Sequence, residues 1–403
     1  MPNLFRGTAT TSSVSRVNRT AILEVLRQHG ALSRQQIEST TGLSPATVNR
    51  LTASLISEQL VVPDGRAPST GGRPSVLLRY TGSSRVVAAI QLRADGAHGA
   101  LVDFDGVFIH RLSRTFEDLD ASKGREKAAR DARLQRTLEL FDSLATTAIE
   151  RGTECLSLGL SVPGAVEHPS GKIGHMHELD FPDVALTDLL RAHTGLPVVV
   201  ENDANAMAFG ELQRGVGRGS SSLVVLHLGS GLGAGIVTNG VLHRGFRGEA
   251  GEVGYLLMER SSLANTFPAF GDLESRIGAL ALTKIARDRG MIVPEGKLLV
   301  VEDIFDLARD GDAVAEGMAG EVLDMIAMAV AAMSIVLDPE MVILGGNSAI
   351  NSNVIIPGVL DRLTGRILRV PRLESATFVD DAVIVGAAEL AAHSVRGLTY
   401  LAG

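Results

Sequence analysis

The stretch that decides the fold lies at the centre of the chain and reads ENDANAMAFGEL over residues 201–212. It follows an apolar run over residues 196–200, so we expect Asn202 and Asp203 at the end of a strand and a helix over residues 204–212. Polar side chains at the carboxyl ends of strands face the ligand cleft of an open α/β sheet. The stretch therefore predicts an α/β protein with a cleft at Asn202 and Asp203.

Two glycine-rich segments extend this prediction. The sequence LGSGLGAG over residues 228–235 separates two apolar runs, and bare backbone N–H groups in such a turn can approach an anion or a ligand. The sequence GEAGEVG over residues 248–254 adds the carboxylate of Glu252. Asn, Asp and Glu converging on one cleft predict a polyol site, because each can hydrogen-bond to vicinal hydroxyls. The alternative for residues 228–235 is a plain turn between strands.

Together and in this order, the three segments resemble those of the ROK family, which groups sugar-responsive repressors and sugar kinases of the actin-like ATPase fold. The resemblance extends over nearly the whole chain. It implies an α/β protein in which a winged helix-turn-helix precedes a two-lobed, ROK sugar kinase-like fold. We expect the domains to be residues 1–80, then residues 81–200 with a closing helix from 381–403, then residues 201–380.

The composition is that of a globular protein of two or three domains, with 45% hydrophobic and 21% charged residues in a chain of 403. The single cysteine, Cys155, rules out an internal disulfide and a multi-cysteine zinc site. The first twenty residues show no signal peptide, and the longest apolar stretch, 325–337, is too short to span a bilayer. We therefore expect a cytoplasmic protein that does not bind membranes.

Charge is unevenly distributed along the chain. Residues 1–80 contain nine arginines, no lysine and four acidic residues, a formal charge of +5, while the whole chain carries −8. Residues 81–403 therefore carry −13. A basic segment attached to an acidic body indicates a nucleic-acid-binding module.

The basic segment has the pattern of a winged helix-turn-helix. Helices are predicted over residues 17–30, 33–41 and 45–59, with a tight turn at Gly42. The start of the third helix would enter the major groove, where Asn49 could read adenine and Arg50 could read guanine or hold a phosphate. The candidate DNA-binding residues of the helices are Arg34, Ser44, Ala46, Thr47, Asn49 and Arg50. The alternative is a helical hairpin that binds protein.

A hairpin over residues 60–80 would form the wing, with GGRP at its tip over residues 71–74. It resembles the Gly-Arg-Pro signature of ROK repressors, and Arg73 is a candidate for insertion into a narrow A·T-rich minor groove. The alternative is a flexible linker. Because the family's kinases lack this 80-residue extension, its presence favours a regulator.

The rest of the first lobe should begin with strands over residues 86–92, 97–103 and 107–112. In the family's kinases the first hairpin carries Asp-x-Gly-Gly-Thr, which cradles the ATP phosphates. The matching residues here are Gln91, Leu92, Arg93, Ala94 and Asp95. The side chains of Arg93 and Asp95 would crowd this cradle, and the Asp95 carboxylate would repel phosphate oxygens. We therefore expect no ATP binding and no enzyme activity.

The resemblance also implies an effector pocket. Asp203 aligns with the family's catalytic base, and Asn202, Glu252 and Glu274 fall on sugar-binding positions; Gly164, in the turn after a strand over residues 155–162, is a further candidate. Tyr255 replaces the family's histidine, and the family's zinc-binding cysteines are absent, so we expect neither zinc nor another cofactor. The alternatives are that Asp203 caps a helix and that Glu274 is a solvated residue at a helix start.

Helices are expected over residues 125–150, 277–289, 301–309, 314–337 and 382–393, and a strand over residues 341–344. The helix over 314–337 has an apolar stripe that would be core or a dimer face, formed by Met325, Ala329, Ala332 and Val336. The helix over 382–393 should pack back on the first lobe.

The sequence thus predicts a repressor of carbohydrate-metabolism genes, acting as a homodimer or tetramer on an operator in double-stranded DNA. A sugar or sugar-phosphate effector would bind between its lobes and change their closure. One alternative is an ATP-dependent sugar kinase with a DNA-binding head. A third possibility makes the lobes a docking module for another protein.

Overall fold

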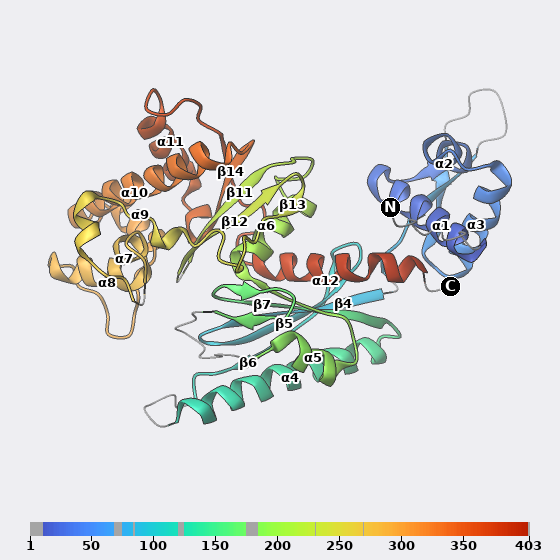
Figure 1. Ribbon diagram of the computed structural model, residues 1–403, viewed down its shortest axis with the longest axis horizontal. Coiled ribbons are helices and arrows are strands. Elements are labelled where there is room, and N and C mark those ends of the chain that lie inside the picture. The colour runs from blue at the N-terminus through green and yellow to red at the C-terminus, as the bar shows by residue number, and fades with distance from the viewer. Residues whose placement is uncertain are drawn as a thin grey trace, which may run out of the picture.

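A computed structural model describes residues 11–67, 75–83, 85–119, 125–174, 184–229, 231–268 and 270–401 (Figure 1). The wing tip with Arg73 lies outside these residues. The described chain forms a small N-terminal head and two larger α/β units, each built on its own sheet. The domain boundaries given above remain a prediction.

The described part of the head, residues 11–67 and 75–80, is a winged helix, as predicted. It contains α1 (Thr11–His29), β1 (Leu32–Ser33), α2 (Arg34–Thr41), α3 (Pro45–Ser57), β2 (Val61–Arg66) and β3 (Val76–Tyr80), with the strand order β1-β3-β2. Ser33 and Gln36 form a capping box at the start of α2, and Gly42 ends that helix with a φ of 69°. Helix α1 starts six residues before its predicted start, because a Ser/Thr-rich segment carries no apolar periodicity.

The first sheet has the strand order β10-β7-β4-β5-β6. Its strands are β4 (Arg85–Arg93), β5 (Gly96–Asp103), β6 (Phe108–Thr115), β7 (Glu154–Val162) and β10 (Val198–Asn202). Strand β7 is parallel to β4 and β10, while β4, β5 and β6 form an antiparallel meander. Beside the sheet lies the small ribbon of β8 (Val166–Glu167) and β9 (Lys172–Ile173).

Alternate residues of β4 face opposite sides of this sheet, as period-two geometry requires. Val86, Ala88 and Ile90 pack with Leu140 and other residues of α4 (Glu126–Glu150), and α5 (Leu186–Thr194) covers the same face. Val87 and Ala89 pack instead with alanines of α12 (Ala382–Leu401). The first sheet is therefore covered by helices on both faces, which explains why its strands read as continuous apolar runs.

The second sheet has the strand order β13-β12-β11-β14-β15. Its strands are β11 (Leu223–Leu228), β12 (Leu232–Thr238), β13 (Val241–Leu242), β14 (Met341–Gly346) and β15 (Arg372–Ser375). One face packs on α6 (Asp203–Arg214). The other packs on α8 (Ala279–Asp288), α9 (Val301–Arg309), α10 (Ala313–Leu337) and α11 (Ser352–Leu363).

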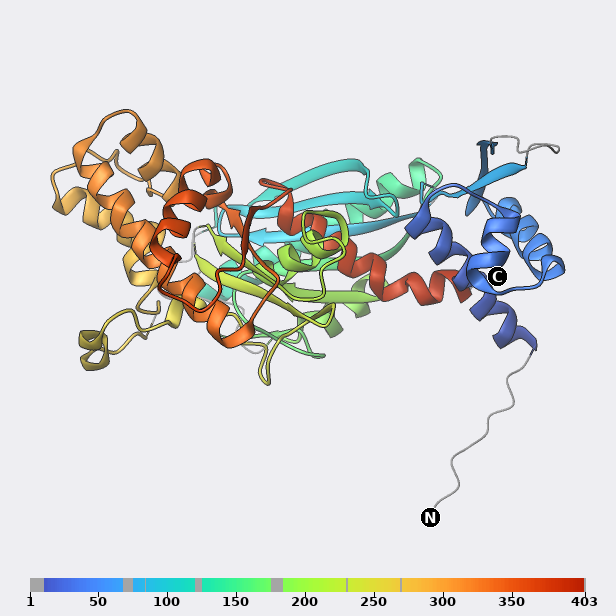
Figure 2. The same cartoon turned by 90° about the horizontal axis from the view of Figure 1, so that it is seen from above.

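Helices α6 and α12 lie against each other between the two sheets, and α12 continues from there to the head (Figures 1 and 2). Their close approach requires small residues, because a Cβ on Gly386 would lie 1.8 Å from the carbonyl oxygen of Ala206. Towards the C-terminal end of α12, Ala392 and Val395 share one apolar cluster with Leu26 of α1. Helix α12 packs on the first sheet as predicted, and it also joins the second unit to the head.

Helix α10 corrects one expectation about apolar stretches. The sequence run of 325–337 is short, but the helix has 25 residues and is long and apolar enough to cross a membrane by length and composition. Its buried residues, such as Met318, Ile326 and Val330, pack in the core of the second unit. The predicted stripe is split, because Ala329 is buried whereas Val336 is 78% exposed.

Candidate ligand pocket and nucleic-acid interface

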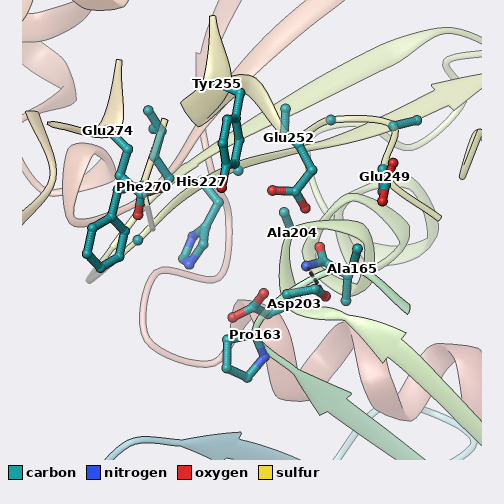
Figure 3. A pocket seen from close by; sticks show the side chains of 18 of the residues that line it. Pro163, Ala165, Asp203, Ala204, His227, Glu249, Glu252, Tyr255, Phe270 and Glu274 are labelled. Atoms are coloured by element: carbon teal, nitrogen blue, oxygen red, sulfur yellow. Dashed lines mark hydrogen bonds between the residues drawn. The ribbon is translucent and has the colours of Figure 1, made fainter. Parts of the chain in front are cut away.

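A cavity of about 660 Å³ lies where the ends of the two sheets meet (Figure 3). All six residues that the sequence predicted for an effector site line it: Gly164, Asn202, Asp203, Glu252, Tyr255 and Glu274. In Figure 3, Glu252 and Tyr255 reach into the cavity from one side and Asp203 from the opposite side. The fold therefore gathers in one place residues that are up to 110 positions apart in the chain.

Asn202 and Asp203 lie at the junction of β10 and α6. The cap of α6 is Asn202 rather than Asp203, because the Asn202 Oδ1 accepts a hydrogen bond from the backbone N–H of Asn205 at 3.1 Å. The Asn202 Nδ2 donates to the carbonyl oxygen of Gly164 at 3.0 Å, which fixes the turn after β7 against the end of β10. The suggestion that Asp203 serves as the helix cap is thus wrong.

The carboxyl group of Asp203 faces the cavity. Burial raises the pKa of Asp203 to about 6, although its own backbone N–H and that of Ala204 lower it. A carboxylate kept from water in this way is a strong hydrogen-bond acceptor for a ligand hydroxyl.

Glu252 and Glu249 come from the glycine-rich segment over residues 248–254, which is tied to β12. The backbone N–H of Ala234 donates to the carbonyl oxygen of Gly251 at 2.8 Å. Gly251 has a φ of 95°, and a Cβ there would lie 1.8 Å from the Ala234 carbonyl oxygen, so only glycine fits. The pKa of Glu252 is raised, first by burial and then by the negative charges of Asp203 and Glu249.

Glu274 lies over Gly231 of the pocket wall and over the neighbouring Gly254. Its Oε1 is 3.3 Å from the position that a Cβ would take on Gly231, and its Oε2 is 3.0 Å from that position on Gly254. Tyr255 is 44% exposed, and its hydroxyl pKa is raised by burial and by the charges of Glu252 and Glu274. Glu274 is the first residue of the short helix α7 (Glu274–Ile277), and it lines the pocket from that position.

Sequence reasoning missed other lining residues, among them His227, Glu249, Phe267 and Phe270. His227 lies near the end of β11, where burial lowers the pKa of its imidazole to about 4, so the ring is uncharged at neutral pH. Its Nδ1 is buried and has no hydrogen-bond partner among the described residues. A polar residue inside the apolar strand, just before the glycine-rich turn, was the signal that could have identified it.

An ion pair with one buried partner connects the two units beside the pocket. The carboxylate of Glu201, in β10, accepts from the Arg244 guanidinium at 2.7 Å and from Asn205 Nδ2 at 3.0 Å. Burial would raise the pKa of Glu201, but hydrogen bonding to His168 and the charge of Arg244 outweigh it, so that the pKa is lowered. Glu201 is therefore a structural carboxylate that holds the segment after β13 against the first sheet.

The β4–β5 hairpin carries the residues that replace the family's phosphate cradle. Arg93 and Asp95 point to each other, with 3.3 Å between Arg93 Nε and Asp95 Oδ1. Both side chains are about half exposed. The described pocket lining does not include them.

On the head, α3 presents one face to the core and the other to solvent. Val48, Leu51 and Leu55 are buried, whereas Asn49 and Arg50 are exposed. Among the other candidates, Ala46 is exposed, and Ser44 caps α3 through its bond with the Thr47 N–H. Arg34 is directed back to α3, since its Nε donates to Thr52 Oγ1 at 3.0 Å.

Comparison with known proteins identifies this architecture. The chain belongs to the ROK family, whose model matches residues 121–394, and residues 18–65 match the IclR helix-turn-helix domain. It is 27% identical over 385 residues to a xylose repressor of Caldicellulosiruptor bescii, covering 93% of this chain and 94% of the relative. It is also 30% identical over 315 residues to a glucokinase of Thermotoga maritima, which corresponds to 74% of this chain and 94% of the glucokinase.

Solved structures show the same fold. A ROK family transcriptional regulator, described as a homolog of the Escherichia coli MLC protein, superposes with a TM-score of 0.77 at 23% identity and covers 96% of this chain and 99% of its own. A ROK glucokinase of Streptomyces griseus, solved with glucose and AMPPNP, gives a TM-score of 0.61 at 24% identity, over 76% of this chain and 99% of its own. The regulator thus matches the head as well as the two sheet units.

Proposed function

We propose that this chain is a DNA-binding transcriptional repressor of carbohydrate-metabolism genes that responds to a sugar. The observation that carries the proposal is the presence, in one chain, of a winged helix and a carboxylate-lined pocket, with α12 packed on both the head and α6. The xylose repressor and the structurally similar regulator support the same function.

The head would bind operator DNA through the start of α3. Asn49 and Arg50 are exposed on the side of α3 away from the core, which is the geometry for reading base edges in a major groove. Arg73, which the sequence predicts at the wing tip, would enter the neighbouring minor groove. As a homodimer or tetramer, the protein would place two heads on two half-sites of one operator.

The effector would bind in the pocket between the two sheets. Asp203, Glu252 and Glu274 would accept hydrogen bonds from its hydroxyls, while Asn202, Tyr255 and Gly164 would complete the wall. The pocket contains residues of both units, so a ligand changes the equilibrium between open and closed forms if it binds one of them more tightly. Through α12 that change would reach the heads.

The protein would act without catalysis and without ATP or zinc. The side chains of Arg93 and Asp95 replace the glycine and threonine that cradle phosphates in the family's kinases, and Gln91 and Ala94 complete the altered hairpin. Tyr255 stands where the family's zinc-linked histidine would be. A DNA operator and the single cysteine agree with a place in the cytoplasm.

The test is to select a duplex from a random library with the purified protein and to measure its affinity by fluorescence anisotropy, with and without a panel of sugars. We expect specific binding that at least one sugar changes, and we expect Asp203→Ala to bind the same duplex without that response. An Asp203→Ala protein that responds normally would exclude this pocket as the effector site.

The second candidate is a sugar kinase with a DNA-binding head, which the 30% identity to a glucokinase and the position of Asp203 favour. It predicts ATP-dependent sugar phosphorylation that Asp203→Asn abolishes. A coupled assay for ADP release decides between the two functions, because a pure repressor releases none.

A further inference from the structure

The ionisable side chains of aspartate and glutamate give the described pocket lining a negative charge. Four of its lining residues are carboxylic acids: Asp203, Glu249, Glu252 and Glu274. Among the lining residues that the structure describes, none is a lysine or an arginine. A phosphate ester carries about two negative charges at neutral pH, and phosphate sites in proteins are formed by arginine, lysine or free backbone N–H groups.

The glycine-rich turn at residues 228–233 is the part of the wall where backbone groups could hold a phosphate, and some of its described backbone groups are already engaged. The backbone N–H of Gly229 donates to the Gly231 carbonyl oxygen at 3.0 Å, and Leu228 pairs with Leu232 in the β11–β12 ladder. The Glu274 carboxylate lies directly over Gly231. An anion at this turn would therefore meet a negative charge at contact distance.

Two described groups near the pocket, Arg244 and His227, do not supply it with positive charge. The Arg244 guanidinium is held at 2.7 Å by the buried Glu201 carboxylate, and it is not part of the described lining. His227 does line the cavity, but its imidazole is neutral because burial lowers its pKa to about 4. Neither of these two groups would thus compensate the charge of a phosphate in the pocket.

A neutral polyol, in contrast to a phosphate, is complementary to this pocket. Ionised carboxylates only accept hydrogen bonds, and each sugar hydroxyl can donate one. The rings of Tyr255 and Phe270 border the same cavity and can pack on the apolar face of a sugar ring. Acceptors on several sides and aromatic rings at the edge suit an uncharged ring that carries several hydroxyls.

We infer that the pocket takes an unphosphorylated sugar and rejects its phosphate esters, with Glu274 as the residue that enforces this choice. The inference rests on the proposed function, which itself requires only that some sugar ligand binds here. The effector is then the free sugar, and the protein stops responding once a kinase has converted that sugar into its phosphate ester.

The experiment is calorimetric titration at pH 8 with matched pairs: xylose and xylose 5-phosphate, glucose and glucose 6-phosphate, N-acetylglucosamine and its 6-phosphate. For the pair that binds, we expect the phosphate to be weaker by at least about a hundredfold, as like charges a few ångströms apart imply. Glu274→Gln keeps the size of the side chain and removes its charge. It should therefore reduce the ratio of sugar affinity to sugar-phosphate affinity by about tenfold or more. Asp288→Asn, which removes a surface carboxylate on α8, is the matched control and should leave the ratio unchanged.

The outcomes separate the two proposals. A sugar phosphate that binds as tightly as its parent sugar, or a Glu274→Gln ratio equal to that of the wild type, would overturn the inference and leave the sugar-responsive repressor standing. If a sugar that changes operator binding binds wild type and Asp203→Ala with equal affinity, the pocket is not the effector site, and both the inference and the pocket assignment of the proposed function are wrong. A melting curve of each variant establishes that the titrated protein is folded.

Discussion

Arg214, the last residue of α6, forms an ion pair with Glu389 of α12, and its other nitrogens donate to the backbone carbonyls of Phe104, at 2.9 Å, and Asp105. The Asp105 carboxylate in turn accepts from the backbone N–H of Gly82 at 3.0 Å, just after the last strand of the head. Helix α6 begins at Asp203 in the pocket. One helix and a short chain of hydrogen bonds therefore connect the ligand pocket to the attachment point of the head.

Removal of Arg214 alone should be costly, because the Glu389 side chain is only 4% exposed and would lose the guanidinium charge that faces it. We expect Arg214→Met to lower the free energy of unfolding by about 3 kcal/mol. The double variant Arg214→Met, Glu389→Met should recover most of this loss, since both charges are then gone. Urea unfolding of the wild type, both single variants and the double variant measures the coupling energy between Arg214 and Glu389. If the two single losses simply add in the double variant, the predicted coupling is wrong.

Arg50→Ala should weaken binding to the selected operator by about 1–3 kcal/mol through the loss of a base or phosphate contact. If Arg50 reads a guanine, the variant relaxes specificity at one position; if it holds a phosphate, affinity falls uniformly and the salt dependence becomes shallower. Arg73→Ala should lose a similar amount at A·T-rich sites. Anisotropy titrations at several salt concentrations give these values. Lys284→Ala, on the surface of α8, removes an equal charge far from the head and should leave operator affinity unchanged.

Asp203→Asn should stabilise the ligand-free protein. The folded-state pKa of Asp203, about 6, lies above its ordinary value of 3.8, so the folded state binds more protons between these values and its stability falls as pH rises through them. At pH 8 the ionised carboxylate therefore costs about 1–3 kcal/mol, which asparagine avoids. At pH 5 the difference between variant and wild type should shrink by roughly half. Urea unfolding at the two pH values tests this, and a difference that grows on acidification would show that the sign is wrong.

Gly386→Ala should destabilise the contact between α6 and α12, since the new Cβ would lie 1.8 Å from the backbone oxygen of Ala206. We expect a loss of about 1–3 kcal/mol or more. Gly320→Ala in α10 is the matched control, because no atom lies within 4 Å of the added Cβ. That variant should gain about 0.5–1 kcal/mol from helix propensity alone. Thermal unfolding measures both stability changes. If Gly386→Ala and Gly320→Ala change the stability equally, the close contact at Gly386 is not the cause.

The sequence was sufficient for elements with strong periodicity. The predicted helix over 301–309 matches α9, and those over 125–150 and 314–337 match α4 and α10 within one residue. Helix α11 was not predicted, because Pro357 lies inside it and an internal proline is normally a sign against a helix. Helix α5 and strand β15 were also not predicted; both are short and depend on their neighbours for stability.

Site residues could be predicted where a polar residue type stands next to a recognisable strand end or glycine-rich segment. Residues that only the tertiary fold brings to the pocket were harder to predict. Asn202 and Asp203 follow an apolar strand, and Glu252 lies in a glycine-rich segment, so their chemistry is visible in the sequence. Phe270 joins the pocket through the path of a loop, which no local pattern encodes, whereas His227 leaves only the weak signal of a polar residue inside an apolar strand. The alternative that Asp203 caps α6 was one residue too late, because Asn and Asp are about equally good caps and the cap is Asn202.

The hydrogen bond from Ser157 Oγ in β7 to the Ala391 carbonyl oxygen in α12 spans 234 residues of sequence at 2.9 Å. While the ribosome makes the chain from its N-terminus, Val87, Ala89 and their neighbours in the first sheet emerge long before the helix that covers them. The head lacks its partner on α12 for the same interval. The nascent protein thus exposes an apolar sheet face until the final segment of this sequence is available, and it is over this interval that we expect it to depend most on chaperones.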